Sequence, residues 1–425
     1  MKVTVSASKI QGEVQAIASK SVAHRYLIAA ALADKDVFVG CHSVSEDIMA
    51  TVGCLQAMGA KIKRRENGFM VSPIDKRGID GNLRQLPCNE SGSTIRFLIP
   101  VVAALGINGE FLKKGSLIQR PLKPLDDEMA KKGAPLLEKE GGVVAVQGKL
   151  EAGIYELPGN VSSQYITGLL FALPLLDKDS EIRITTALQS EDYVKITLDT
   201  LKVFSISIKY ENNCFYIPGK QVYTVSSEPT VEGDWSNAAF FMTGAAIGKS
   251  EITYTNLSKE SLQGDKAVVE ILKNMGAHIH VTGDAYNVSG DNLKATEIDA
   301  KPIPDLVPIL ALAAAVAEGE TVIFNAERLR IKESDRLKTV YETLHTLGAD
   351  IEEKEDGLII RGKERLKGGT VSSFNDHRIA MMAAIASIVC DGEVTILQAE
   401  SVNKSYPGFY EDFKKLGGQV RIDEE

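Results

Sequence analysis

The sequence has little cysteine and little histidine, and neither residue type is clustered. Its 425 residues include five cysteines and six histidines. No two cysteines form a C-x-x-C pair, and the histidines show no ligand spacing. A disulfide framework and a zinc site are therefore not indicated. Scattered cysteines of this kind are usually small buried residues, so we expect no metal site.

The chain also lacks long apolar runs and a basic excess. No stretch has the roughly 18 apolar residues that a bilayer-spanning helix needs, and the start, MKVTVSASKI, resembles neither a signal nor a transit peptide. The net charge of −9 and the pI of about 5.4 argue against a nucleic-acid binder. We expect a cytoplasmic protein that acts on small molecules and binds neither nucleic acid nor membrane. A local basic pocket for an acidic metabolite remains compatible with this composition.

What the sequence does contain is a repeat of about 70 residues. In each copy a helical segment ends at a glycine and a β-like run follows, as in CLQAMGAKIKRRENGFMV. Glycine suits this place because helices often end with one residue at positive φ. At about 100–200 residues per domain, six α/β repeats predict two similar domains of three repeats each. The repeat markers are Gly59, Gly142, Phe204, Gly276, Gly348 and Gly417.

Each repeat also contains a second, very apolar helical segment. RIAMMAAIASIV and NAAFFMTGAAIG are two examples. A helix that is apolar all round is buried. Each repeat is therefore expected to have one buried helix and one amphipathic surface helix.

A polar cluster stands at the start of each apolar helix. Ser, Asp and Asn are common helix N-caps, so capping alone could explain most of these residues. It does not explain Lys20, Arg25, Arg96 and Arg378, because a cation is unfavourable at a helix N-terminus unless an anion joins it. The clusters therefore predict sites for a small molecule with several negative charges. They are SKSVAHR (19–25), NESGSTIR (89–96), SSQY (162–165), GDWSN (233–237), PDLVP (304–308) and NDHR (375–378).

The most charged stretch is RLRIKESDRLK, residues 328–338. Read as a strand, it would place Arg328, Arg330 and Lys332 on one side, with Ser334 or Asp335 capping the helix that follows. A solvated edge strand before a capped helix would explain this pattern without any function. In the other interpretation, the adjacent lysine and glutamate contact a substrate and move protons.

Taken in order, these clusters resemble the enolpyruvyl transferases over almost the whole chain. One motif alone would be weak, but eight in order on a sixfold repeat are specific. The motifs are SKSVAHR, GSTIR, QRP, SSQ, GDWS, IPDLVPILA, RIKESDRL and NDHRIAM.

The resemblance implies an α/β fold of two similar domains, each made of three βαβαββ-type units in an inside-out α/β barrel. It implies an inserted domain over 18–232 and a discontinuous domain over 1–17 and 233–425. In the family, the active site lies between the domains, and closure assembles it.

The resemblance also implies the reaction. In the branch that the motifs favour, the enolpyruvyl group of phosphoenolpyruvate passes to the 5-hydroxyl of shikimate 3-phosphate, by addition and then elimination of phosphate. This step belongs to chorismate and aromatic amino acid biosynthesis. It needs no metal or organic cofactor, and the family leans towards monomers.

Residue roles carry over by position in the motifs. Asp305 would be the base for the 5-hydroxyl and Glu333 the proton donor to the methylene carbon, with Lys20 and Lys332 also catalytic. Shikimate 3-phosphate would contact Lys20, Ser21, Arg25, Ser162, Ser163, Gln164, Ser190, Asp305 and Lys332. Phosphoenolpyruvate would contact Lys20, Gly92, Arg120, Gln164, Arg336, Arg378 and Lys404, and His377 would complete the pocket.

The sequence departs from the family pattern at several of these places. Glu90 stands where an asparagine usually touches phosphoenolpyruvate, and Arg328 where an asparagine usually contacts shikimate. Glu191-Asp192 replaces Lys-Pro, and Ile17-Ala18 replaces Pro-Gly. These changes predict altered kinetics and an altered response to the inhibitor glyphosate.

Three alternatives stay open. The cell-wall branch, UDP-N-acetylglucosamine enolpyruvyl transferase, has a cysteine on the loop before its Arg-Pro, and here that loop reads KKGSLIQRP. RNA 3′-phosphate cyclase shares the repeat but should have a basic RNA path. A non-catalytic anion-binding relative would bind its ligands without turnover.

Overall fold

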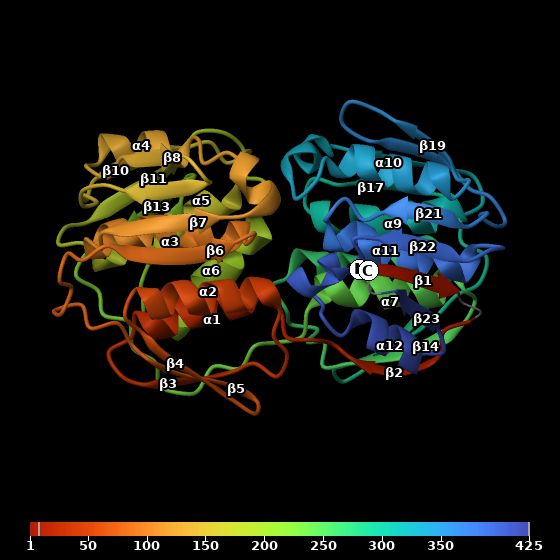
Figure 1. Cartoon of the computed structure of the whole chain (residues 1–425), viewed down its shortest axis with the longest axis horizontal. Coiled ribbons are helices and arrows are strands. Elements are labelled where there is room, and N and C mark those ends of the chain that lie inside the picture. The colour runs from red at the N-terminus through yellow and green to blue at the C-terminus, as the bar shows by residue number, and fades with distance from the viewer. Residues whose placement is uncertain (7–8, 424–425) are drawn as a thin grey trace. The chain divides into compact units, whose positions relative to one another are not determined.

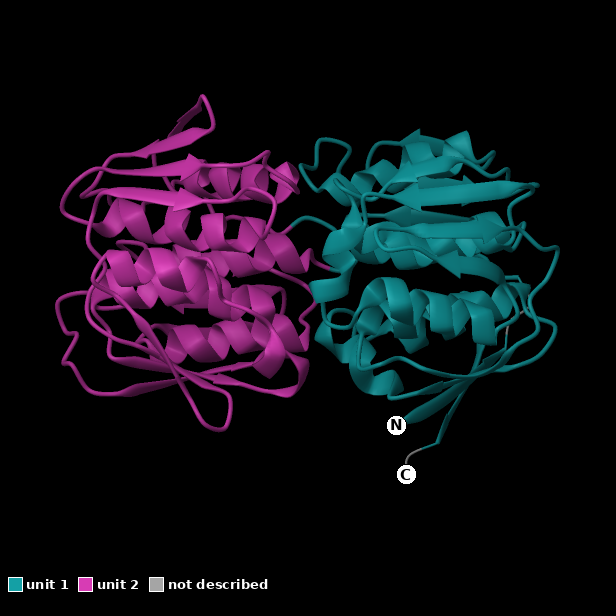
Figure 2. Ribbon diagram, turned by 90° about the horizontal axis from the view of Figure 1, so that it is seen from above, with its two compact units in different colours: residues 1–17, 232–425 teal, residues 18–231 magenta. Residues whose placement is uncertain are grey.

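The structure, a computed structural model, describes residues 1–6 and 9–423 (Figure 1). Its contacts divide the chain into two compact units (Figure 2). Unit 1 consists of Met1–Ile17 and Glu232–Glu425, and unit 2 of Ala18–Val231. The chain therefore begins in unit 1, forms all of unit 2 and then returns. Glu232, expected in the inserted domain, belongs to unit 1 instead.

Unit 2 contains three small sheets and six α-helices. The sheets have the strand orders β3-β5-β4, β6-β7-β9-β8 and β10-β11-β13-β12. The strands are β3 (Val37–Gly40), β4 (Lys61–Arg65), β5 (Gly68–Ser72), β6 (Arg84–Asn89), β7 (Gly109–Lys113), β8 (Leu136–Lys139), β9 (Val143–Val146), β10 (Ile154–Leu157), β11 (Ser180–Ile184), β12 (Lys209–Glu211) and β13 (Cys214–Ile217). The helices are α1 (Lys20–Ala31), α2 (Glu46–Ala57), α3 (Gly92–Leu105), α4 (Leu125–Lys131), α5 (Ser163–Ala172) and α6 (Glu191–Val203), with 3-10 turns η1 (Gly115–Gln119) and η2 (Leu173–Leu175).

Unit 1 is built in the same way. Its sheets have the orders β21-β22-β1-β23, β15-β16-β14-β2 and β17-β18-β20-β19. The strands are β1 (Lys2–Ser6), β2 (Gly12–Gln15), β14 (Glu251–Thr255), β15 (His278–Thr282), β16 (Ala285–Ser289), β17 (Glu297–Asp299), β18 (Glu320–Phe324), β19 (Asp350–Glu353), β20 (Leu358–Arg361), β21 (Gly369–Ser372), β22 (Val394–Leu397) and β23 (Gln419–Asp423). The helices are α7 (Trp235–Ile247), α8 (Val268–Asn274), α9 (Val307–Ala315), α10 (Arg336–Thr346), α11 (His377–Ala386) and α12 (Phe409–Lys415), with 3-10 turns η3 (Gly264–Ala267), η4 (Pro304–Leu306), η5 (Glu327–Ile331), η6 (Ser387–Val389) and η7 (Ala399–Lys404).

Five of the six sheets of the described residues share one topology, which is the predicted βαβαββ unit; the sixth, β3-β5-β4, has three strands that all pair antiparallel. In the sheet of β17 to β20, β17 and β18 are parallel and are joined through α9. After α10 the chain adds β19 and β20, and β20 pairs antiparallel with both β18 and β19. The N-terminal segment completes two such sheets of unit 1. β1 lies between β22 and β23, and β2 pairs with β14.

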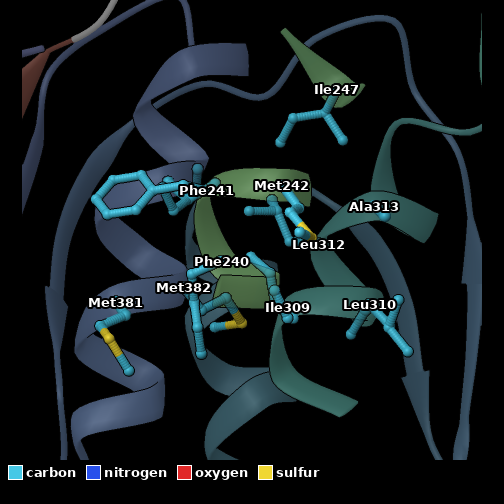
Figure 3. Packing of buried hydrophobic residues seen from close by; sticks show 14 of the residues in the cluster. Phe240, Phe241, Met242, Ile247, Ile309, Leu310, Leu312, Ala313, Met381 and Met382 are labelled. Atoms are coloured by element: carbon cyan, nitrogen blue, oxygen red, sulfur yellow. The ribbon is translucent and has the colours of Figure 1, made fainter. Parts of the chain in front are cut away.

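The apolar helices form the cores, as their composition predicts. Every residue of α7 is buried, and α7 packs against α9 and α11 in unit 1 (Figure 3). Phe240, Leu312 and Met382 are among the fully buried side chains of this cluster. Each such side chain contributes about 1.5–3 kcal/mol through burial, so the start of each apolar helix is anchored in its core.

One repeat marker is wrong. Gly142 does not end a helix, because residues 136–139 form β8 and Gly142 lies in the turn before β9. The helix of that repeat is α4, and Gly133 follows it at φ 79°. In the third of the six repeats, the positive φ belongs to Ser205, immediately after the expected Phe204.

The strand expected at residues 328–332 is also absent. Residues Glu327–Ile331 form the 3-10 turn η5, after β18 has ended at Phe324. The alternation of Arg328, Arg330 and Lys332 therefore does not place them on one side. The expected cap is present, since the Asp335 side chain accepts a hydrogen bond from the Lys338 backbone N–H at the start of α10.

Candidate active site

The predicted polar clusters lie at the starts of the buried helices. Lys20, Gly92, Ser163 and His377 are the first residues of α1, α3, α5 and α11. Capping by side chains is part of their role, as expected. The residues whose side chains accept a hydrogen bond from a first-turn N–H are Ser91, Ser162, Asp234 and Asp376.

In unit 1, Asp305 lies among three cations. Its carboxylate accepts hydrogen bonds from Arg336 Nη1 at 2.7 Å, Arg378 Nη2 at 3.2 Å and Lys332 Nζ at 3.5 Å. Burial alone would raise the pKa of this carboxyl, but the charges of Arg378, Lys332 and Arg336 outweigh it and hold the pKa well below the ordinary value. Asp305 is therefore ionised at neutral pH.

Arg336 is bound by three carboxylates. Besides Asp305, it donates to Asp376 Oδ2 from Nε at 2.8 Å and to Glu333 Oε2 from Nη2 at 2.6 Å. Its side chain is 1% exposed. Burial opposes the charge on Arg336, but Asp376, Glu333 and Asp305 together raise its pKa above the ordinary value. A substrate carboxylate at Arg336 would have to share these donors with the protein's own acids.

Lys332 contacts Asp305 in this group, and Glu333 contacts Arg336. Burial lowers the pKa of Lys332, while Asp305 acts in the opposite direction. Lys332 is the C-terminal flank of η5, and Glu333 lies three residues before Arg336. The structure therefore brings Asp305, Lys332, Glu333 and Arg336 together.

Arg378 completes the cluster from α11. It donates from Nη1 to the Asp305 backbone carbonyl at 3.1 Å and from Nη2 to Ser236 Oγ at 2.8 Å. Ser236 in turn contacts Asp265. Burial raises the pKa of Asp265 to about 7, and Asp305 adds to the shift. The sequence analysis placed Ser236 in the GDWSN cluster (233–237) without giving it a role, and it did not identify Asp265.

The other predicted residues of unit 1 lie on the same elements. His377 is 2% exposed and its Nδ1 lies 3.9 Å from Asp376 Oδ1. Lys404 is buried and donates to the Asn375 carbonyl at 2.7 Å. Arg330 instead pairs with Glu353 at 2.8 Å and with Asp335, so it stabilises the turn rather than the cluster.

In unit 2, two cations on α1 are held in different ways. Lys20 Nζ lies 2.8 Å from Asp47 Oδ2, at the start of α2. Arg25 donates to the Thr197 hydroxyl, the Ser21 carbonyl and the Tyr193 carbonyl. Burial lowers the pKa of Arg25 to about 9. Arg25 forms no ion pair within the described part of the chain, so its buried charge suits a bound anion.

A second basic group surrounds the start of α3. A Cβ added at Gly92 would lie 2.8 Å from Arg120 Nη1 and 2.9 Å from Arg96 Nη1. Arg96 also donates to Gln164 Oε1 at 2.8 Å, and Gln164 donates to Ser93 Oγ at 2.9 Å. The structure thus brings Gly92, Arg120 and Gln164 together and adds Arg96, which the sequence had placed at a helix start.

The predicted serines lie at the starts of α5 and α6. Ser162 caps α5 through the Gln164 backbone N–H, and Ser163 follows it. Ser190, at φ 52°, precedes α6. Glu191 and Asp192 form the first turn of α6, where acidic residues are favourable.

Glu90 is accommodated beside the loop of η1. A Cβ on Gly115 would lie 2.6 Å from each Glu90 carboxylate oxygen, and Gly115 has φ 50°. Gly115 therefore leaves the room that this carboxylate occupies. The fold therefore accommodates the carboxylate of Glu90, the residue that departs from the family pattern.

Two cavities within unit 2 lie away from these groups. One of about 170 Å³ is lined by Asp75, Asp80 and Arg84 among others, and one of about 440 Å³ by Ile154, Lys209 and Tyr216 among others. No predicted site residue lines either cavity. Over residues 1–6 and 9–423, no three histidine, cysteine or acidic side chains gather as a metal site would require.

The chain was compared with known proteins. A family model described as EPSP synthase (3-phosphoshikimate 1-carboxyvinyltransferase) matches residues 5–413. The chain belongs to the EPSP synthase family.

Curated EPSP synthases are similar over their whole length. The 3-phosphoshikimate 1-carboxyvinyltransferase of Clostridium perfringens is 44% identical over 423 residues, covering 99% of each chain. That of Clostridium beijerinckii is 45% identical over 421 residues, covering 96% of each. A solved structure of EPSP synthase from Acinetobacter baumannii superposes with a TM-score of 0.81 at 27% identity, covering 99% of this chain and 100% of that one.

Membership of the EPSP synthase family confirms three predictions. These are the resemblance itself, the α/β fold of two similar repeated halves, and the enzymatic activity, EC 2.5.1.19. Among the described residues, none of the helices has the length and apolarity to cross a bilayer.

Proposed function

We propose that the chain transfers the enolpyruvyl group of phosphoenolpyruvate to the 5-hydroxyl of shikimate 3-phosphate, using the residues of the two clusters described above. The observation that carries this proposal is the group around Asp305, where one ionised carboxylate, a second acid and three cations meet. This set offers a base, an acid and positive charge for anionic substrates.

Shikimate 3-phosphate is the substrate that the unit 2 residues fit. Arg25 and Ser21 bind its carboxylate. The buried Arg25 guanidinium, which forms no ion pair over residues 1–6 and 9–423, supports this role. Its phosphate binds at the N-termini of α5 and α6, where backbone N–H groups favour anions. The residues that bind this phosphate are Ser162, Ser163, Gln164 and Ser190.

Phosphoenolpyruvate carries two anionic groups, a phosphate and a carboxylate. Its phosphate lies at the start of α3, with Arg120, Gln164 and Lys20, where Gly92 lets the backbone approach. Its carboxylate binds to Arg336 and Arg378, whose planar guanidinium groups can bind a carboxylate through two parallel hydrogen bonds. Lys404 and His377 complete the group of residues around this carboxylate.

The chemistry needs one base and one acid. Asp305 takes the proton of the 5-hydroxyl while the hydroxyl oxygen forms a bond to the second carbon of phosphoenolpyruvate. Glu333 protonates the methylene carbon of phosphoenolpyruvate. The adduct then loses phosphate while the new methyl group returns a proton, which restores the double bond. Lys332 and Lys20 offset the negative charge that develops.

Binding and catalysis are coupled at Asp305. In the substrate-free protein the surrounding cations make this carboxylate a weak base. A substrate carboxylate at Arg336 and Arg378 would use part of their positive charge. The pKa of Asp305 would then rise towards that of an effective base.

Phosphate release tests the proposal. Purified protein receives phosphoenolpyruvate and shikimate 3-phosphate together, with each alone as control. Release that requires both substrates supports the proposal. Binding of shikimate 3-phosphate by calorimetry without any release would favour the non-catalytic relative instead.

UDP-N-acetylglucosamine is the rival acceptor. The loop over residues 113–121 contains no cysteine, which argues against the cell-wall branch. Phosphate release with this acceptor in place of shikimate 3-phosphate would reverse the assignment. A monomeric, cytoplasmic enzyme without cofactor stays a prediction, which sedimentation, cell fractionation and activity after chelation would check.

A further inference from the structure

Two buried hydrogen bonds link Arg378 to Asp265 through Ser236. Its Nη2 donates to Ser236 Oγ at 2.8 Å, and Ser236 Oγ is hydrogen-bonded to Asp265 Oδ2. Arg378, Ser236 and Asp265 are 4%, 9% and 4% exposed. They come from α11, α7 and η3, so the line joins three elements that are far apart in the sequence.

The chemistry of each group determines which atoms donate and which accept in this line. A guanidinium can only donate, so Ser236 accepts from Arg378. When Asp265 is ionised it can only accept, so it takes the single hydroxyl proton of Ser236. Asp265 thus turns a lone pair of Ser236 towards Arg378.

Asp265 does little else with its side chain. Within the described residues, its carboxyl group has Ser236 as its one hydrogen-bonding partner and forms no ion pair. It does not cap α8, whose N-cap is Ala267. A buried carboxyl group is costly unless a specific contact compensates it, and here that contact leads to Arg378.

Ser236 holds Arg378 from a different element than Asp305 does. The two bonds to Asp305 reach the backbone and side chain of one residue on η4. Ser236 adds a bond from a different element, α7. Acceptors on two elements restrict rotation of the guanidinium more than acceptors on one.

We infer that Asp265 is a positioning residue, which holds Ser236 so that Arg378 presents its guanidinium to the carboxylate of phosphoenolpyruvate. The inference rests on the proposed function, because that function assigns the carboxylate to Arg378. Asp265 and Ser236 do not touch the substrate in this arrangement. Their contribution is to the affinity for one substrate.

Steady-state kinetics of the full chain, with each substrate varied in turn, test this inference. Ser236→Ala and Asp265→Ala should each raise the KM for phosphoenolpyruvate about tenfold, as expected for losing a hydrogen bond to a charged group. The KM for shikimate 3-phosphate should change less than twofold. Asp265→Asn keeps an oxygen that can accept the Ser236 proton, so its KM for phosphoenolpyruvate should stay within about threefold of the unsubstituted protein.

Two matched controls come from the same unit. Asp412→Asn alters another carboxylate that accepts from a hydroxyl, that of Tyr406 at 2.7 Å. Ser387→Ala removes another buried serine hydroxyl, which bonds the Ala384 carbonyl. Neither residue contacts Arg378, and both variants should keep both KM values.

The outcomes separate the inference from the proposed function. Wild-type turnover with an unchanged KM for phosphoenolpyruvate in Ser236→Ala and Asp265→Ala overturns the inference alone. Equal rises in both KM values also overturn it, since they indicate general damage. No turnover by the wild-type protein overturns the proposed function and the inference with it. Should Asp265→Ala fail to fold, Ser236→Ala and Asp265→Asn still decide between these outcomes.

Discussion

At the scale of single residues, the acid and base assignments make the most direct prediction. Asp305→Ala removes the base, and Glu333→Gln removes the acid while keeping an oxygen for Arg336. Each change should lower kcat about 10²–10⁴-fold, the usual contribution of general acid–base catalysis. Both variants should still bind shikimate 3-phosphate in calorimetry, because Arg25 and the serines of α5 and α6 are unchanged.

Asp305→Ala also makes a prediction about the affinity for phosphoenolpyruvate. Asp305→Ala removes a negative charge among Arg336, Arg378 and Lys332. This anionic substrate should therefore bind at least as tightly to Asp305→Ala as to the wild-type protein. Unchanged kcat in both variants would remove the acid and base assignments.

Asp265 makes stability depend on pH. Burial raises its folded-state pKa from the ordinary 3.8 to about 7, so folding favours the protonated form. The stability linked to this group is complete below about pH 4 and is lost as the pH rises to 7. The groups facing it are Arg378, Asp305 and Asp234.

Asp265→Asn removes this titration. Its free energy of unfolding, relative to the wild-type protein, should therefore rise between pH 5 and pH 8, by on the order of 3 kcal/mol. Urea unfolding at both pH values measures the change, with Asp412→Asn as the control. An equal difference at the two pH values would mean that Asp265 titrates near its ordinary pKa.

The residues that sequence reasoning missed have partners far along the chain. Asp265 lies 29 residues from Ser236 and Ser236 lies 142 from Arg378. Local motifs identified Asp305, Glu333 and Arg336, because each stands in a distinctive short segment. They could not identify a carboxyl group whose role comes from a helix two repeats away.

At the scale of elements, the start of α3 requires glycine at position 92, because two arginine side chains occupy the space beside it. Gly92→Ala would place a Cβ 2.8 Å from Arg120 Nη1 and 2.9 Å from Arg96 Nη1. Both guanidinium groups would have to move, so the KM for phosphoenolpyruvate should rise about tenfold or more, with little loss of stability. Steady-state kinetics and thermal unfolding measure the two effects.

Gly53→Ala is the matched control in α2. There a Cβ would lie 3.4 Å from Pro87 Cγ, an ordinary contact. The helix should gain up to about 1 kcal/mol, since alanine favours helix more than glycine does. A Gly92→Ala variant that behaves like Gly53→Ala would show that the two arginines adjust without cost.

Most elements could be predicted because their signals are local. Runs of apolar residues with a cap before them gave α3, α5, α7 and α11. The errors came where two structures share one pattern. Charged residues alternate in a 3-10 turn at η5 as they would in a strand, and the glycine of a hairpin turn at Gly142 resembles the glycine after a helix.

At the scale of the whole molecule, unit 1 depends on the first residues of the chain. β1 pairs antiparallel with β22 on one side and β23 on the other. Val3 and Val5 are fully buried. Without this strand the sheet loses its inner member, and its neighbours expose unpaired backbone groups. Unit 2, by contrast, is one continuous segment with its own core.

Fragments should therefore fold unequally. Residues 18–231 alone should unfold cooperatively in urea, whereas residues 232–425 alone should not, because they lack β1 and β2. Lys2 lies opposite Asp423 in the ladder, so the first strand of the chain and its last strand, β23, lie side by side in unit 1. Joining residue 425 to residue 1 through a short glycine–serine linker, as 232–425–linker–1–17, should restore cooperative folding. Circular dichroism and urea titration of the three chains measure this. A cooperative transition in 232–425 without the linker and 1–17 would show that the N-terminal strands complete the sheets without being needed to form them.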